Sequence, residues 1–271
     1  MLKYKSSSGK FAKIFFYLCV YLSCMPLWLL FVLATSNFWP YPALLPERMS
    51  LEFFASVLGD TNTLNAALTT VLLGILTVLL SLAIAIPAAK ALAQRSFWGK
   101  GFVRMLVLVP IVVPGIALII GIHISMIRLG LAGTLFGVAI MHTLFAVPYS
   151  IRILTNMYEI LGEELEQQAK VLGASPFFIF LRVTLPRIMP GILAAGMLGF
   201  SISIAQYITT FIIGGGRVIT ITILMVPLIR GAETHFAAVY SVLLLATSFL
   251  SLALIEGIVR RYYNFKNVYQ V

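Results

Sequence analysis

The chain has 271 residues, of which 61% are hydrophobic and only 10% are charged, with a mean hydropathy of +1.02. A soluble domain of this length would carry roughly 25% charged residues, so a soluble globular protein is excluded. The net charge of +10 does not indicate a nucleic-acid partner, because the basic residues form short clusters between apolar runs. One membrane domain over residues 1–271 is expected, since no polar stretch is long enough to fold separately.

The first apolar run, residues 13–34, is expected to be an uncleaved membrane helix. Its length is about that of a full span, whereas the apolar core of a signal peptide has roughly 7–15 residues. No small-residue cleavage site of the A-x-A kind follows it. Cys19 and Cys24 both lie in this run, and we expect them to pack in the helix and not to form a disulfide or a metal site.

The apolar runs predict an all-α integral membrane protein with six transmembrane helices. A membrane core of about 30 Å requires about 20 mostly apolar residues per helix. The second run is longer than this, so we expect it to tilt or to project beyond the bilayer. Pro110 and Pro114 predict a bend in the third, which either lines a pathway or serves packing. The expected spans are 13–34, 63–93, 103–127, 134–155, 190–213 and 237–259, with a core over 63–260.

The basic residues predict that both termini are cytoplasmic. If the amino terminus is inside, nearly all of the 19 Lys and Arg residues fall on the cytoplasmic side, as the positive-inside rule requires. The four exceptions are Arg48, Arg128, Arg217 and Arg230.

The longest cytoplasmic connection, residues 156–189 between the fourth and fifth spans, is predicted to form two short helices. Acidic residues open the first helix, over about 163–172, at the end that the helix dipole favours. Gly173 is expected to end it. Ser175 is a good N-cap for the second helix, and Pro176 fits the first turn.

The second short helix is expected to present phenylalanine and leucine side chains on one face and to close at Leu185-Pro186, where the chain returns to the membrane. Ala169, Gly173 and Ala174 keep the centre of the pair small, as in a unit that enters a groove on a partner protein. The alternative is a hairpin that lies on the lipid surface.

The residues of this connection resemble the EAA loop of permeases in ATP-binding-cassette (ABC) importers. That pattern reads Glu-Ala-Ala, three residues, Gly, nine residues, then Ile-x-Leu-Pro. Here Gly173 and the Leu-Pro pair stand at the same spacings. The candidate coupling residues are Glu166, Gln167, Gln168, Ala169, Gly173, Ala174, Ser175, Val183, Leu185 and Pro186.

The chain departs from the pattern at its first two positions, which are Gln167 and Gln168. A glutamine accepts hydrogen bonds but cannot make the charge-assisted contact of a carboxylate. Glu166 or Glu164 is a possible substitute, and how the change affects coupling to an ATPase is left open.

The resemblance implies a non-catalytic permease subunit of a multi-pass type I importer in the bacterial inner membrane. In that family the loop sits in a cleft of a separate ATPase subunit, present in two copies, which binds ATP and Mg²⁺. A second permease, the same or a different chain, completes the substrate path, and an extracytoplasmic binding protein delivers the substrate. No phosphate-binding G-x-x-x-x-G-K-[ST] stretch occurs in this chain, so no cofactor or catalytic site is expected in it.

The fifth span most resembles permeases of the polyamine, thiamine, iron and phosphonate group, through Ile204-Ala-Gln-Tyr207 and the Gly214-Gly-Gly-Arg217 run. The resemblance therefore implies a small polar substrate. The polar residues of this apolar helix either line the substrate path or tie helices together. These candidates are Gln206, Tyr207, Thr209 and Thr210.

Two other functions are weighed against the importer. A gradient-driven transporter or channel would carry ionisable residues or repeats within its spans, and the chain is poor in both. A membrane enzyme would need a polar catalytic cluster, which the sequence does not indicate. His123 and His142 are expected to be packed or hydrogen-bonded between helices, and no metal site is expected.

Overall fold

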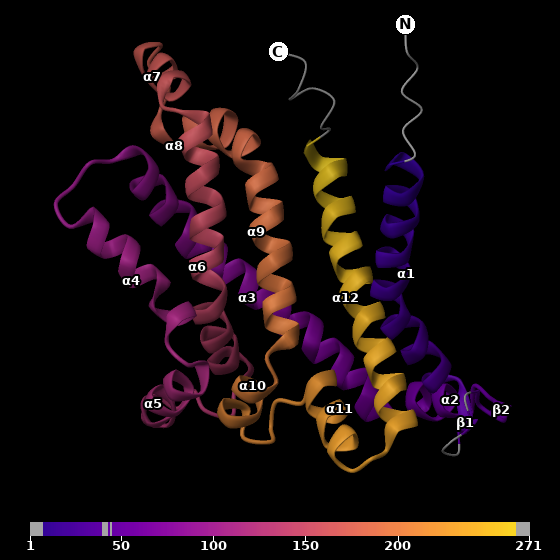
Figure 1. Ribbon diagram of the computed structural model, residues 1–271. Helices are drawn as coiled ribbons and strands as arrows, with labels where there is room; N and C mark the ends of the chain where they lie inside the picture. Colours follow the sequence, from indigo (N-terminus) through magenta and orange to yellow (C-terminus); the bar gives the residue numbers. More distant parts are fainter. Residues whose placement is uncertain (1–7, 40–42, 44, 264–271) are drawn as a thin grey trace, which may run out of the picture.

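The computed structural model describes residues 8–39, 43 and 45–263, and these form a helical bundle with one small hairpin of strands (Figure 1). The elements are α1 Ser8–Ala34, β1 Ser36–Phe38, β2 Arg48–Met49, α2 Glu52–Gly59, α3 Thr61–Gln94, α4 Lys100–Val112, α5 Gly115–Arg128, α6 Leu135–Leu161, α7 Glu164–Val171, α8 Pro176–Ile179, a π-helical turn η1 Phe180–Thr184, α9 Leu185–Ala205, α10 Tyr207–Gly214, α11 Ile221–Arg230 and α12 Thr234–Tyr263.

Five helical segments in the described part of the chain are long and apolar enough to cross a membrane. A sixth span results if α4 and α5 are counted as one, and these two helices meet at 99°. The all-α membrane fold is thus confirmed. The third span bends as predicted, because Pro114 supplies no N–H to continue α4 and instead stands at the N-cap of α5.

The centre of the bundle consists of α3, α6 and α9, with α3 crossing the other two obliquely (Figure 1). This tilt accommodates the 34 residues of α3, which was predicted to be over-long. Small residues let the helices approach closely. At Gly74 of α3, a Cβ atom would lie 2.4 Å from the ring of Phe200 of α9. Phe200 is fully buried, so this crossing leaves no room for a side chain.

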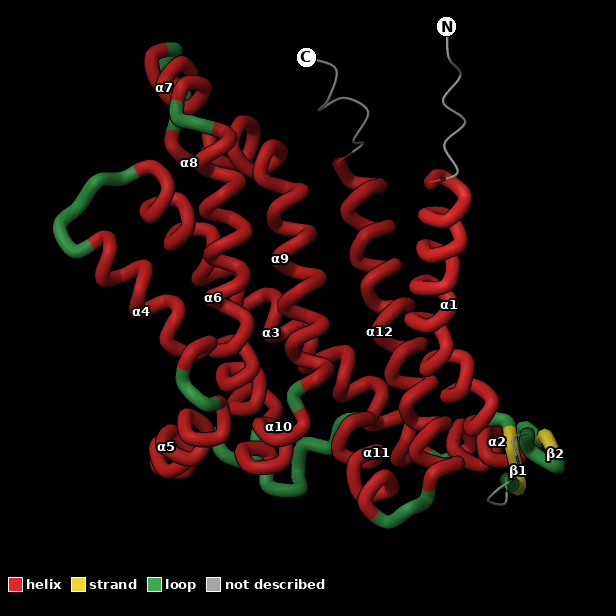
Figure 2. The backbone as a smooth tube through the Cα atoms, in the orientation of Figure 1, coloured by secondary structure: helices red, strands yellow, loops and turns green. Residues whose placement is uncertain are grey.

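The first helix stands beside the bundle and packs against α12 (Figure 2). None of its apolar 18-residue window is buried within the chain. Below it, β1 and β2 pair antiparallel, with Ser36 opposite Met49. The Ser36 hydroxyl also lies 3.1 Å from Nδ1 of His235 on α12. This hairpin and the short helices α2 and α11 were not predicted, since each has fewer residues than a membrane span.

The start of α1 and the end of α12 lie at the same end of the bundle as α7 and α8 (Figure 1). That end is the cytoplasmic one by the distribution of basic residues. The termini themselves, residues 1–7 and 264–271, lie outside the described residues, and so do Lys3, Lys5 and Lys266 of the charge count.

The fifth span differs from the prediction at both ends. A continuous helix over 190–213 was expected, but α9 begins at Leu185 and ends at Ala205, and α10 follows after Gln206. The expectation that Leu185-Pro186 would close the second short helix is therefore wrong. The Leu185 N–H donates to the Phe180 carbonyl, five residues back. This wider turn directly precedes Pro186, so the proline is accommodated without a break.

Candidate functional site

The first short helix of the loop forms where the sequence predicts it, and the second begins where predicted but continues into α9. The first runs over Glu164–Val171, and Gly173 follows it with a φ of +80°, a conformation that glycine adopts without strain. The Ala174 N–H donates to the Ala169 carbonyl and the Gly173 N–H to the Lys170 carbonyl. This pair of bonds is the Schellman motif, which satisfies the last carbonyls of the helix.

The start of the second short helix is fixed by Ser175. Its hydroxyl accepts a hydrogen bond from the Phe178 N–H at 3.3 Å, and Pro176 occupies the first turn. Since α8 runs through η1 into α9, the loop is mechanically continuous with a membrane helix (Figure 2).

A buried ion pair joins the loop to α3. The Glu166 side chain accepts hydrogen bonds from Nζ of Lys90 at 2.7 and 2.8 Å and from the Thr184 hydroxyl at 2.6 Å. Only 5% of Glu166 is exposed, whereas 35% of the Lys90 side chain is exposed. Burial alone would raise the pKa of Glu166, but these hydrogen bonds and the charges of Lys90 and Lys170 outweigh it, so the pKa is lowered. We call Lys90, Glu166 and Thr184 the clamp.

The clamp connects three elements, because Lys90 lies on α3, Glu166 on α7 and Thr184 on η1. A second contact supports it where Nε2 of Gln94 donates to the Gly162 carbonyl at 3.2 Å. Neither Lys90 nor Thr184 was predicted from the sequence as a site residue. Lys90 is the only charged residue in the run 63–93, and a lone charge in an apolar helix is a signal for a buried partner.

The inward position of Glu166 bears on the glutamines of the motif. Its carboxylate is turned into the chain, whereas Glu164 is exposed, and a substitution for the motif glutamate stays a prediction for both. Gln167 and Gln168 are exposed too, and Nε2 of Gln167 donates to Glu163 at 3.3 Å.

The outer face of the first short helix carries a shallow groove. Val171 is 88% exposed and Leu172 is 85% exposed, although both are large apolar residues. Exposed apolar patches on helices mark interaction sites. The residues that line this α7 groove are Glu164, Gln167, Gln168, Val171 and Leu172.

The remaining motif residues lie around the groove at different depths. Gly173 and Ser175 are exposed, while the others are half-buried where the loop meets the bundle. These half-buried residues are Ala169, Ala174, Val183, Leu185 and Pro186.

The candidate residues for the substrate path gather at the break between α9 and α10. The Thr209 hydroxyl donates to Oε1 of Gln206, and the Thr210 hydroxyl donates to the Gln206 carbonyl, both at 2.7 Å. Both bonds run from the first turn of α10 back to Gln206, the residue at the break. Both threonines are at most 1% exposed, whereas Gln206 and Tyr207 are half-buried.

Thr210 belongs to a buried polar network that ties four helices together. His142 of α6 lies 2.9 Å from the Ser203 hydroxyl and 3.0 Å from the Thr210 hydroxyl. Ser203 in turn lies 3.2 Å from the Thr77 hydroxyl of α3. This is the helix-tying role that the sequence left as the alternative, and it accounts for Thr210 within the chain. A role in the substrate path stays a prediction for Gln206, Tyr207, Thr209 and Thr210.

Within the described residues, no group of three or more His, Cys, Asp and Glu side chains is arranged to hold a metal ion. Cys19 and Cys24 are free and exposed on α1.

Comparisons with known proteins agree with this architecture. Residues 81–264 match the family described as "Binding-protein-dependent transport system inner membrane component". The chain is 30% identical over 201 residues to the molybdenum transport system permease protein ModB of Haemophilus influenzae, an alignment that covers 67% of this chain and 86% of that protein. It is 26% identical over 214 residues to a spermidine/putrescine permease PotC homolog of Mycoplasma pneumoniae, covering 78% and 73%.

The fold is also similar to that of a solved bacterial ABC transporter involved in the import of alginate. The TM-score is 0.71 at 17% identity, over 97% of this chain and 99% of the other. A second structure, of an alginate transporter in complex with a periplasmic protein that carries an alginate pentasaccharide, matches with a TM-score of 0.68 at 16% identity, over 96% of each chain.

Proposed function

This chain belongs to the family of inner membrane components of binding-protein-dependent transport systems, and from that premise we propose how it works as the permease of an ABC importer. The α7–α8 unit docks on a separate ATPase subunit and transmits its movement to the helices that form the substrate path. ATP and Mg²⁺ are bound by that partner, and this chain carries out no chemistry of its own.

The observation that carries this proposal is the contrast between the two faces of α7. Its inner face is held by Glu166, which is bonded to Lys90 and Thr184. Its outer face exposes Val171 and Leu172 to an extent unusual for aliphatic side chains. A helix that is fixed on one side and apolar on the other is suited to receive a partner and to move as a unit with the bundle.

The continuity of α8, η1 and α9 gives the movement a route to the membrane. A displacement of the α7 groove acts on α3 through Lys90 and on α9 through η1. The next residue after α9 is Gln206, a candidate residue for the substrate path. A partner shifts a conformational equilibrium only if it binds the two states with different affinities. The ATPase therefore has to dock differently in the inward-facing and outward-facing states.

The assembly that we propose contains two ATPase subunits, a second permease and an extracytoplasmic binding protein, in a bacterial inner membrane. The second permease supplies the other wall of the path. The exposed face of α1 supports such a neighbour or lipid, because no residue of its apolar window is buried within the chain. A solved relative of the same fold, which was crystallised with its periplasmic protein, supports the binding protein as a partner.

The substrate that we propose is a small polar solute of the polyamine, thiamine, iron or phosphonate type. Relatives named for molybdenum and for spermidine and putrescine support a small polar or charged solute as the class. Gln206 and Tyr207 would offer neutral hydrogen-bonding groups to such a solute, while specificity resides mainly in the binding protein.

Co-purification of the ATPase with two matched variants tests the proposal. Leu172→Asp places a charge in the α7 groove, and Ile160→Asp places the same charge at an aliphatic residue that is 81% exposed at the end of α6. We expect Leu172→Asp to lose most of the ATPase and of the transport, and Ile160→Asp to retain both. If Leu172→Asp keeps a full complement of ATPase and full transport, the α7 groove is not the docking surface.

A further inference from the structure

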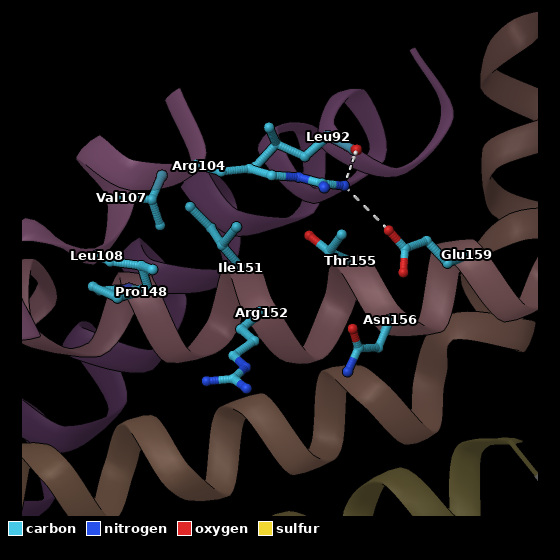
Figure 3. A pocket seen from close by; sticks show the side chains of 10 residues that line it. All are labelled: Leu92, Arg104, Val107, Leu108, Pro148, Ile151, Arg152, Thr155, Asn156 and Glu159. Atoms are coloured by element: carbon cyan, nitrogen blue, oxygen red, sulfur yellow. Dashed lines mark hydrogen bonds and ion pairs between the residues drawn. The ribbon is translucent and has the colours of Figure 1, made fainter. Parts of the chain in front are cut away.

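A pocket of about 410 Å³ lies near the cytoplasmic ends of α3, α4 and α6 (Figure 3). Arg104 reaches over it from α4, and Arg152 and Asn156 line it from the other flank of α6. Glu159 also lines it, so two arginines and one glutamate leave the lining with a net positive charge. A basic pocket between membrane helices at the cytoplasmic side is the type of site that binds anionic lipid headgroups.

The polar groups at the mouth of the pocket are incompletely paired. Nη2 of Arg104 lies 3.3 Å from Oε1 of Glu159 and 3.3 Å from the Leu92 carbonyl. A guanidinium has five N–H donors, so the donors on its other nitrogens remain able to bind a ligand. The Arg104–Glu159 pair is half-exposed, and such surface pairs hold their partners weakly.

The buried hydroxyl of Thr155 points to a missing ligand. Only 9% of Thr155 is exposed, and its oxygen has no hydrogen-bond partner within the described part of the chain. Figure 3 shows this side chain on the flank of α6 that faces Arg104 of α4. A buried hydroxyl without a partner is costly, so an acceptor bound beside Arg104 would satisfy it.

An apolar groove continues the pocket towards the middle of the membrane. A second cavity of about 460 Å³ shares Val107 and Pro148 with the first, and aliphatic side chains line most of it. Its one hydroxyl, that of Thr143, already donates to the Ala139 carbonyl at 2.7 Å. The two cavities together are basic at the cytoplasmic end and apolar within the bilayer.

We propose that this composite pocket binds one anionic phospholipid of the cytoplasmic leaflet. Its phosphate lies at Arg104 and Thr155, its headgroup extends towards Arg152, and an acyl chain follows the groove past Val107 and Pro148. A free anion would leave the groove unexplained, and a neutral lipid would leave the two arginines unexplained. The site is independent of the docking of an ATPase at the α7 groove.

Native mass spectrometry of the assembled transporter, with lipid added in detergent, tests this proposal. The probes are phosphatidylglycerol, phosphatidylcholine and glycerol phosphate, so that lipid, charge and free anion are distinguished. The variants are Arg104→Gln, Val107→Phe and, as a matched control outside the pocket, the exposed Arg182→Gln. A thermal melt of each variant checks that it folds.

We expect the wild type and Arg182→Gln to retain phosphatidylglycerol in preference to phosphatidylcholine. Arg104→Gln should weaken retention about fivefold, the factor for one basic contact at a membrane surface. Val107→Phe should weaken it although both arginines remain, because the ring fills the groove. The proposal is overturned by equal retention of both lipids, by equal losses in Arg104→Gln and Arg182→Gln, or by full competition from glycerol phosphate. It is overturned as well if no lipid is retained, as when a second permease fills the pocket.

Discussion

Nζ of Lys90 lies 2.7 Å from the carboxylate of Glu166, and this contact joins the cytoplasmic end of α3 to α7, the first short helix of the 156–189 loop. The Thr184 hydroxyl completes the clamp from η1.

Removal of the Lys90 charge is expected to loosen α7. Lys90→Met would leave the buried carboxylate of Glu166 without a counter-ion. In a fully buried pair this loss costs several kcal/mol of stability. Because Lys90 is partly exposed, we expect a cost of about 1–2 kcal/mol here. Hydrogen exchange of the α7 amides should therefore accelerate roughly 5–30-fold. The control is Lys170→Met, which removes the same charge from the exposed face of α7. Equal acceleration in both variants would show that net charge, and not the clamp, holds α7.

Acid is expected to weaken the clamp only below the ordinary titration range of glutamate. Hydrogen bonds and positive charge lower the pKa of Glu166 despite its burial. A carboxyl with a lowered pKa in the folded state contributes its stability above the unfolded pKa and loses it as the pH falls through the folded pKa. The melting-temperature difference between wild type and Glu166→Gln should stay constant from about pH 8 to 5 and shrink below about pH 4. A difference that disappears between pH 7 and 5 would contradict this assignment.

Substitutions at Gly173 should lower stability most where the new residue least tolerates a positive φ. The backbone there has a φ of +80°, and an added Cβ would meet no atom of the chain within 4 Å. Gly173→Val should therefore lower stability by about 1–2 kcal/mol through backbone strain, and Gly173→Asn by less. Thermal melts in detergent would measure both. The control is Gly101→Val, at a helical glycine with equal space and no positive φ, which should change stability little.

The crossing of α3 and α9 is expected to tolerate no side chain at Gly74. Gly74→Ala would place a Cβ 2.4 Å from the buried ring of Phe200. Such overpacking of the core should lower the stability of the protein by about 1–3 kcal/mol. Gly196→Ala on α9 is the matched control, because its nearest contact would be an ordinary 3.4 Å to Val78. Adding Phe200→Leu to Gly74→Ala should recover part of the loss. Equal melting temperatures for the two single variants would contradict the packing described here.

Much of the coupling loop was predictable because its structure is local. Ser175 caps α8, which begins at the next residue, Pro176. Gly173 ends α7, whose last residue is Val171. The clamp was not predictable in the same way, since Lys90 and Glu166 are 76 positions apart and only the fold brings them together.

The errors in the fifth span also have a physical origin. Pro186 was expected to end a helix, but a π-helical turn in front of it removes the conflict. No proline or glycine stands at the Gln206 break, where the hydroxyls of Thr209 and Thr210 both donate to Gln206. Hydropathy does not register either effect, so the sequence indicated one uninterrupted span.

The central claim is that the α7 groove contacts an ATPase, and site-specific cross-linking in the assembled complex tests it most directly. Cys19 and Cys24 are first replaced by serine, and a single cysteine is then introduced as Gln168→Cys in the groove or as Gly101→Cys, an exposed cytoplasmic position on α4. With a short thiol-to-amine reagent, we expect a covalent adduct with the ATPase from Gln168→Cys, in a yield that changes with ATP, and little from Gly101→Cys. No adduct from Gln168→Cys in a complex that still transports would contradict the account.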